Sequence, residues 1–355
     1  MRTLLHYLTT PNPEVRREGL RAGPNTFPVG DYDIEGVEPW LDFSYETIMD
    51  CFGDILTTPV DDDLFNDPPP IAAHDLNLTD ESSVTFILTK RHHTIIDCAL
   101  QIAQDQLKDR GFGFPISWSL GSRSHVQEDP RLRPDWAVTN HSGKPPYEDL
   151  GPGDTKQSKK WNTSMKDSRD EHMREEFEKA LRQVHLYSIR VNCRSCFLIS
   201  DLELVWLRRR KSPEPARPLS TSRPRRLVSQ ENSRRVTSIT SVLSGTSSMS
   251  LDSSGSPYTD GGNPDINEGP FEMCVVPWSN HGVGNLTINL AMFAAALWAA
   301  TDNSVRESYP PLASWERIRG PSGEILYRQV GSLKIASTLP PDAILSQPEQ
   351  ISDAL

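Results

Sequence analysis

Two aspartates and a lysine are the residues of this sequence whose types and spacing best suit catalysis. Asp154 and Lys156 are separated by one residue in LGPGDTK, so on a strand their side chains project from the same face. Asp135 precedes Asp154 by about 19 residues, enough for two short strands and a hairpin loop. Metal-dependent phosphodiester hydrolysis requires carboxylates that hold a divalent cation against the phosphate and a neighbouring cation that orients the attacking water.

A polar pair further along the chain is placed to join these residues. Gln183 and Tyr187 are four residues apart, which puts them on one face of a helix. This helix is predicted from about 170 to 191, because the stretch lacks proline and glycine and has apolar residues on neighbouring turns. The same residues can also be explained without any chemistry. Pro134–Asp135 would then form a turn, residues 151–156 a solvated loop, and Gln183 and Tyr187 part of an ordinary helix surface.

The elements around these residues predict an α/β fold. Apolar spacing indicates a helix from about Val84 to a stop at Gly111. Two strand candidates, FPISWSL and RPDWAVT, followed by LGPGDTK, predict an antiparallel meander. After the second helix, CFLISDLELVWLRR reads as a strand or a two-strand hairpin, GPFEMCVVPWSNHG as a strand, and TINLAMFAAALWAATDN as a helix covered on several sides.

The order of these elements and motifs resembles the PD-(D/E)xK nuclease superfamily. The resemblance comprises a helix, a meander with Pro134–Asp135 and Asp154-Thr155-Lys156, a helix with Gln-x-x-x-Tyr similar to the RecB-like branch, and a further strand. More narrowly, RPDWAV, LGPGDTKQSKKW, CFLISDLELVWLRR and VVPWSNHG look like a fungal PD-(D/E)xK nuclease-like family, and this likeness spans residues 80–300. It implies a restriction-endonuclease-like αβββαβ core, in which helices flank a mixed sheet.

The resemblance also implies roles for the individual residues. Asp135 and Asp154 would ligate Mg²⁺ or Mn²⁺, with the Thr155 carbonyl as a further ligand, and Lys156 would position the water. Gln183 and Tyr187 would bind Lys156 or a phosphate. Asp97 is the candidate for the family's acid on the first helix, but a satisfied, partly buried carboxylate beside Cys98 explains it equally well.

Three functions are compatible with this set of residues. The first is a metal-dependent nuclease that cleaves DNA in preference to RNA. The second is a catalytically inactive module that keeps the nuclease fold and binds nucleic acid or protein. The third is a hydrolase of another phosphate ester, because two carboxylates and a lysine do not name the substrate. In each case the oligomeric state is left open by the sequence.

The charge balance limits how nucleic acid would be bound. The chain has a formal net charge of −11, which is the wrong sign for coating nucleic acid through bulk electrostatics. A local basic strip is needed, and Arg208–Lys211 with the arginines that follow is a candidate for a phosphate contact or a nuclear localisation signal. A solvated strand end that discourages aggregation is the alternative interpretation.

Composition predicts one folded core with poorly ordered additions. Residues 1–79 are rich in proline and aspartate and read as a poorly ordered N-terminal arm, and 80–302 as the nuclease-like domain. A serine-, proline- and arginine-rich insertion at 212–267 interrupts that domain and is predicted to be disordered, and 303–355 reads as a hairpin-like extension with a tail.

Several other kinds of site find little support in the sequence. Cys193 and Cys196 lack a second pair at zinc-site spacing, and the adjacent His92 and His93 point in different directions on a helix. There is no G-x-S-x-G, Walker-type loop or G-x-G-x-x-G fingerprint. Five scattered cysteines, the lack of a signal peptide and the lack of a membrane span favour an intracellular protein, in the nucleus or cytoplasm.

Overall fold

The computed structural model describes residues 1–21, 34–113, 115–124, 133–212, 268–346 and 351–353 of the 355 residues. Its α-helices are α1 (Leu4–Leu8), α2 (Tyr45–Thr57), α3 (Glu81–Ile87), α4 (Thr94–Leu107), α5 (Glu171–Arg190) and α6 (Ile288–Thr301), with a π-helical segment over Leu88–His93 joining α3 to α4. Short 3₁₀ turns cover Asp62–Leu64, Lys108–Arg110, Gly121–Arg123 and Thr163–Asp167.

Seven strands form the central sheet, in the order β2-β9-β8-β7-β6-β5-β4. They are β2 (Val37–Pro39), β4 (Ile116–Leu120), β5 (Trp136–Asn140), β6 (Glu148–Lys156), β7 (Ser195–Ser200), β8 (Glu203–Arg208) and β9 (Phe271–Pro277). The pairs β6/β7 and β2/β9 are parallel and the other pairs antiparallel, so the sheet is mixed. The predicted α/β class, the meander β4-β5-β6 and the β7/β8 hairpin are confirmed.

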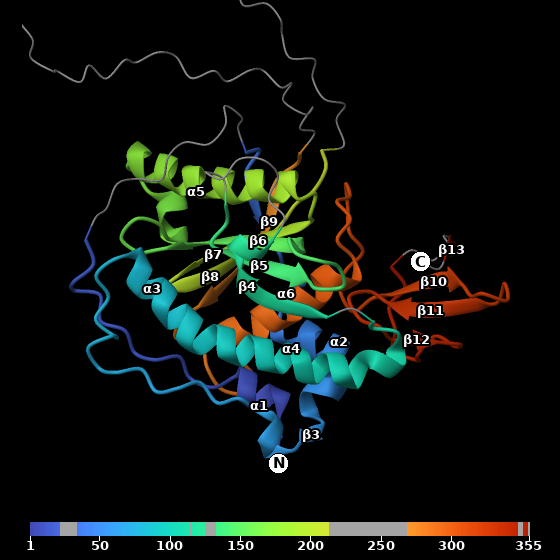
Figure 1. The fold of residues 1–355 in the computed structure, drawn as a ribbon. Coiled ribbons are helices and arrows are strands. Elements are labelled where there is room, and N and C mark those ends of the chain that lie inside the picture. The colour runs from blue at the N-terminus through green and yellow to red at the C-terminus, as the bar shows by residue number, and fades with distance from the viewer. Residues whose placement is uncertain (22–33, 114, 125–132, 213–267, 347–350, 354–355) are drawn as a thin grey trace, which may run out of the picture. The chain divides into compact units, whose positions relative to one another are not determined.

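Helices cover both faces of this sheet (Figure 1). Along β7, Phe197 and Ile199 belong to the core under α4 and α6, whereas Leu198 belongs to the core under α5, because successive strand side chains alternate between faces. The α5 helix agrees with the predicted span and begins at the cap Asp170. Gly111, with φ of 84°, ends the helical segment that starts with α3, as predicted.

The predicted poorly ordered arm over 1–79 is wrong for the parts described, which are 1–21 and 34–79. Leu4, Leu5, Tyr7 and Leu8 of α1 are buried. The α2 helix buries one face against the same core and begins at the cap Ser44. A short two-stranded sheet, β1 (Arg2–Thr3) with β3 (Pro59–Val60), ties the two ends of this region together. The proline-rich composition therefore led to a wrong prediction, because this region contains two helices that complete the core.

The C-terminal region contains a second, smaller sheet. The predicted hairpin is formed by β10 (Trp315–Arg319) and β11 (Ile325–Gln329), to which β12 (Ile335–Ala336) and β13 (Ile351–Asp353) add. Apart from Ser212, the insertion predicted to be disordered at 212–267 lies outside the described residues, and its flanks, up to Lys211 and from Glu268, belong to one compact unit.

The apolar stretch near residue 290 forms a buried helix, as predicted. Twelve residues of α6 are buried, which explains why it lacks a polar face. Across the described parts of the chain, the helices fall short of the combined length and apolarity that crossing a bilayer requires.

Candidate active site

The start of β5 and the end of β6 bring Asp135 and Asp154 together. The antiparallel register pairs Trp136 with Gly153. Asp135, which precedes Trp136, therefore lies beside Asp154, which follows Gly153. The backbone N–H of Thr155 donates to Asp135 Oδ2 at 3.0 Å. The two aspartates therefore meet across adjacent strands, as the sequence predicted.

Two glycines allow the close packing that this arrangement requires. A Cβ on Gly121 would lie 2.1 Å from the Pro134 carbonyl oxygen, and the Gly121 N–H donates to the Asp135 carbonyl at 2.9 Å. A Cβ on Gly153 would lie 2.2 Å from the Phe197 ring. The first glycine fixes the entry to β5 and the second lets β6 lie against β7, so both position the aspartates.

Lys156 links the aspartates to the α5 helix. Its ammonium donates to Asp154 Oδ2 in a very short contact and to Gln183 Oε1 at 3.0 Å. Gln183 Nε2 in turn donates to the Tyr187 hydroxyl at 2.7 Å. Gln183 and Tyr187 thus share a helix face that is turned toward the lysine. Hydrogen bonds thus join Asp154, Lys156, Gln183 and Tyr187 in one chain, and Asp135 is held beside it by the backbone N–H of Thr155.

The cluster is largely withdrawn from solvent. Asp154 is 3% exposed and Lys156 is 5% exposed, whereas Asp135 and Gln183 are partly exposed. The protein has cavities elsewhere, one at the end of α6 and one lined by Arg123, His141 and Tyr147. The cluster meets solvent through its two partly exposed members, Asp135 and Gln183.

Burial and like charge shift the titration of these groups. Burial, and then the negative charge of Asp154, raise the pKa of Asp135 to about 7. Burial alone would lower the pKa of Lys156, but the charges of Asp154 and Glu81 outweigh it and raise that pKa. Burial also raises the pKa of Tyr187. At neutral pH the lysine is a cation, and the partly buried carboxyl of Asp135 has a pKa close to the pH.

Glu81 is a member of this cluster that the sequence analysis missed. It is the first residue of α3, after the cap Asp80, and its carboxylate lies 3.6 Å from the Lys160 ammonium. Burial raises the pKa of Glu81, and the charges of Lys156 and Asp154 act on it in opposite directions. The predicted helix began at about Val84, so Glu81 lay outside it. The sequence signal for the true start is the capping box Asp80-x-x-Ser83.

Asp97, the predicted acid on the first helix, is not brought to this cluster. It lies on α4, and the groups that act on its carboxyl are His93, the backbone N–H of Trp118, His141 and Arg123. Burial raises the pKa of Asp97. Asp97 and Glu81 lie on one continuous helical segment made of α3, the π-helical segment and α4, and Glu81 stands at its beginning.

A second group of contacts fastens the N-terminal region to the end of β6. The Asp201 carboxylate, 1% exposed, accepts from the Ser158 N–H and hydroxyl at 2.7 Å each and from Arg17 Nε at 2.8 Å. The carbonyls of Leu20 and Arg21 accept from Lys159 and Gln157. Nothing in the sequence pattern predicted that residues 17–21 would border the site.

The basic strip predicted at Arg208–Lys211 is mostly not a free surface. Arg208 is 3% exposed and pairs with Glu272, and Arg209 is 5% exposed and pairs with Glu268. Arg210 pairs with Glu38. The first two arginines therefore serve the packing of β8 and do not form an exposed strip for a nucleic-acid backbone or an import receptor.

The donor set of the cluster suits a divalent cation, although no complete cage is formed. Glu81, Asp135 and Asp154 offer carboxylate oxygens, which Mg²⁺ and Mn²⁺ prefer. Burial and then the charge of Asp154 raise the pKa of Asp135, and a bound cation would relieve the repulsion between the two carboxylates. Within the described ranges, no three histidine, cysteine or acidic side chains already stand in a metal-holding arrangement.

Comparisons with protein-family models, curated proteins and solved structures gave no match for this chain. The resemblance to PD-(D/E)xK nucleases therefore rests on the residues quoted above and on the order of the elements that carry them.

Proposed function

We propose that the protein is a metal-dependent nuclease that hydrolyses phosphodiester bonds, with DNA preferred over RNA as substrate. The observation that carries the proposal is the meeting of Asp135, Asp154 and Lys156 at one point, with the Gln183 amide bound to the lysine. The register of β5 and β6 and the position of α5 thus bring two carboxylates, an ammonium and an amide together, which is the set of groups that metal-dependent hydrolysis requires.

The proposed roles follow from these contacts. Asp135 and Asp154, with the Thr155 carbonyl and Glu81 nearby, would hold Mg²⁺ or Mn²⁺, which supplies a Lewis acid at the scissile phosphate when bound. Lys156 orients the attacking water and offsets charge that develops on the phosphate. Gln183 fixes the position of the Lys156 ammonium, and Tyr187 fixes the Gln183 amide.

The element order supports a restriction-endonuclease-like core. The segment from α4 through β4, β5, β6 and α5 to β7 follows the order αβββαβ, and β6 and β7 are parallel neighbours. The α5 crossover between them carries Gln183 and Tyr187 over the strand that carries Asp154 and Lys156. The proposed nuclease core thus consists of the elements from α4 to β7, together with Glu81 of α3.

A catalytically inactive module for nucleic-acid or protein binding is the second candidate function. It is favoured by one observation: the Lys156 ammonium is hydrogen-bonded to the Asp154 carboxylate, and both are nearly inaccessible. A lysine that neutralises the carboxylate opposes the cation that activity needs. The net charge of −11 also disfavours unaided binding to a polyanion.

The deciding experiment is a cleavage assay on the purified full chain. Single- and double-stranded DNA and RNA are incubated with Mg²⁺, Mn²⁺ or EDTA, and the Asp154→Asn variant is assayed beside the wild type. The matched control is Glu178→Gln, an acid on the exposed side of α5 that pairs with Arg182. We expect metal-dependent cleavage by the wild type and the control, and a loss of at least about 100-fold in Asp154→Asn.

The two candidates give different outcomes in this assay. Equal cleavage by wild type and Asp154→Asn would refute the site. Nucleic acid bound by all three proteins and cut by none would favour the inactive module.

A further inference from the structure

A cavity of about 40 Å³ lies at the C-terminal end of α6. It is lined by Arg194, which precedes β7, Arg208 of β8, Thr301 and Asp302 at the end of α6, and Tyr309 beyond it. Apolar residues near β11 complete the wall. Two guanidinium groups thus share one small space. Arg194 lies just before Ser195 at the start of β7, whereas Asp154 and Lys156 pair with Leu198 and Ser200 further along that strand.

Arg194 shares its counterion, Asp302, with a second arginine. Arg194 is 6% exposed, and its Nη1 donates to Asp302 Oδ2 at 3.4 Å. The same oxygen is 2.9 Å from Arg306, which is closer. Arg194 Nε is buried and makes no hydrogen bond to any described residue. One carboxylate therefore serves two guanidinium groups, and one N–H donor faces no acceptor.

Two other buried arginines, Arg208 and Arg209, differ from Arg194 in their carboxylate partners. Arg208 binds Glu272 at 2.6 Å and has Asp42 at 3.8 Å, and Arg209 binds Glu268 in a very short contact. Each of them thus has a carboxylate in closer contact than the 3.4 Å between Arg194 Nη1 and Asp302 Oδ2. A buried charge without such a partner is costly, because burial removes its hydration. An anion bound beside Arg194 would remove that cost.

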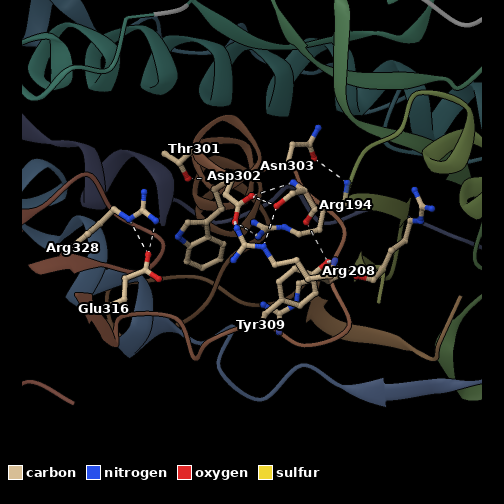
Figure 2. A network of polar contacts seen from close by, with 12 residues as sticks. Arg194, Arg208, Thr301, Asp302, Asn303, Tyr309, Glu316 and Arg328 are labelled. Carbon is tan, nitrogen blue, oxygen red and sulfur yellow. Dashed lines mark hydrogen bonds and ion pairs between the residues drawn. The ribbon is translucent and has the colours of Figure 1, made fainter. Parts of the chain in front are cut away.

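Aromatic packing holds the two guanidinium groups in place. The Tyr309 ring lies 5.2 Å from the Arg194 guanidinium carbon and 4.5 Å from that of Arg208, and the Tyr309 hydroxyl donates to the Arg209 carbonyl at 2.6 Å. Figure 2 shows Arg194, Asp302 and Tyr309 gathered at the end of α6, with the pair Arg328–Glu316 lying apart from them. The arginines are preorganised, which lowers the entropic cost of binding.

We propose that this cavity binds a small oxyanion, of the class of inorganic phosphate and sulfate, through Arg194 and Arg208. Planar guanidinium groups match the oxygens of such an anion and bind them with charge-assisted hydrogen bonds. The small volume admits one such group and no extended polymer. Asp302 limits the affinity for the anion, because its negative charge repels an incoming dianion. Hydrogen bonds from Ser304 and the ion pair with Arg306 partly offset that charge. The site is separate from the proposed nuclease function and does not depend on it.

Thermal unfolding of the full chain, followed at constant ionic strength, tests the proposal. Inorganic phosphate, sulfate, acetate and a nucleoside monophosphate are each titrated against a chloride background. A ligand that binds only the folded state raises Tm with its concentration in a saturable way. We expect a saturable rise with phosphate and sulfate, and a smaller rise with acetate. A rise with the nucleoside monophosphate as large as that with phosphate would assign the cavity to a nucleotide's phosphate, whereas no rise would assign it to the free ion.

Two variants make the test specific. Arg194→Gln keeps a polar side chain but removes the guanidinium, and phosphate affinity should fall at least about tenfold. Arg328→Gln removes a guanidinium that pairs with Glu316 outside the cavity, and should leave the phosphate response unchanged. A wild-type response no larger than that to chloride, or an equal response in Arg194→Gln, would overturn the proposal.

A structural measurement covers the case in which Arg194→Gln does not fold. Wild-type crystals soaked in selenate should show an anomalous peak within hydrogen-bonding distance of Arg194 and Arg208. Water alone in the cavity at saturating selenate would refute oxyanion binding and leave Arg194 Nε bonded to solvent.

Discussion

Replacing Asp135 by asparagine should change how stability depends on pH. Asparagine keeps the shape of the side chain and an oxygen that can accept from the Thr155 N–H, but it cannot ionise. Burial and the charge of Asp154 raise the pKa of Asp135 from 3.8 to about 7 in the folded state. At a pH between these two values, the carboxyl therefore holds a proton in the folded state that it has lost in the unfolded state.

The sign and the size follow from this difference. A raised pKa gives a stabilising contribution that is complete below the unfolded value of 3.8 and is lost as the pH rises through about 7. The full loss is on the order of 4 kcal/mol, and about 3 kcal/mol of it falls between pH 5 and pH 8. These are upper limits, because relaxation of the site and partial solvation weaken the effect.

Urea unfolding of wild type and Asp135→Asn at pH 5 and at pH 8 measures the effect. The variant should gain stability relative to the wild type on going from the lower to the higher pH. Asp149, a buried carboxyl on β6 whose pKa burial also raises to about 7, provides the matched control. Asp149→Asn should show a similar relative gain, although Asp149 takes no part in the cluster.

Divalent cations distinguish the effect of replacing Asp135 from the effect of replacing Asp149. At pH 8, Mg²⁺ or Mn²⁺ should stabilise the wild type and Asp149→Asn by relieving the repulsion between Asp135 and Asp154, but should have little effect on Asp135→Asn. Equal pH dependence in wild type and Asp135→Asn would show that Asp135 does not titrate as argued. Equal stabilisation of all three proteins by the cation would place the metal elsewhere.

Three further changes test how the site is supported. Asp201→Ala removes the shared partner of Arg17 and Ser158 and should cost about 3 kcal/mol in urea unfolding, whereas the exposed Asp105→Ala should stay within about 0.5 kcal/mol of wild type. Gly121→Ala drives a Cβ against the Pro134 carbonyl and should destabilise by more than about 2 kcal/mol, whereas Gly143→Ala, with open space around it, should be neutral by the same measurement. Gln183→Ala removes one acceptor of Lys156 and should lower kcat about tenfold in the cleavage assay while metal affinity is unchanged; a change in metal affinity alone would contradict the positioning role.

Local patterns were enough to predict the elements that hold the proposed site. The meander was predicted from turn signals and the α5 helix from uninterrupted helix formers, and both lie where they were expected. Asp154 and Lys156 share a face because strand side chains alternate, which depends on no distant contact. Their meeting with Gln183 depends on the α5 crossover, which the order of elements alone suggested.

What the sequence did not predict depends on distant contacts or on short segments. Residues 17–21 reach the site through Asp201, more than a hundred residues away, and no local pattern encodes this. The α2 helix does carry a helical spacing, with Ile48, Cys51, Phe52 and Ile55 on one face, but neighbouring prolines and aspartates outweighed it in the prediction. Arg208 and Arg209 looked like a basic surface because their carboxylate partners lie far along the chain.

The contact between Lys156 and Asp154 leads to a last prediction, which separates metal binding from catalysis. In the folded protein this ammonium neutralises a carboxylate that is proposed to bind the metal, and both groups are almost fully buried. Lys156→Gln removes a positive charge beside the cation, so Mn²⁺ should bind at least about tenfold more tightly, equivalent to about 1.4 kcal/mol. Cleavage should nevertheless be lost, because no cation then orients the water.

Lys159→Gln is the matched control for this change. The Lys159 ammonium binds the Leu20 carbonyl and lies outside the cluster, so its replacement should leave Mn²⁺ affinity within about twofold of wild type. Calorimetric titration with Mn²⁺ measures all three proteins under one set of conditions. Tighter binding with lost cleavage in Lys156→Gln alone is the result expected of a nuclease in which lysine and metal compete for Asp154. Weaker binding in that variant would mean that the lysine holds the carboxylates in their metal-binding arrangement, and the competition argued from the buried pair would be wrong.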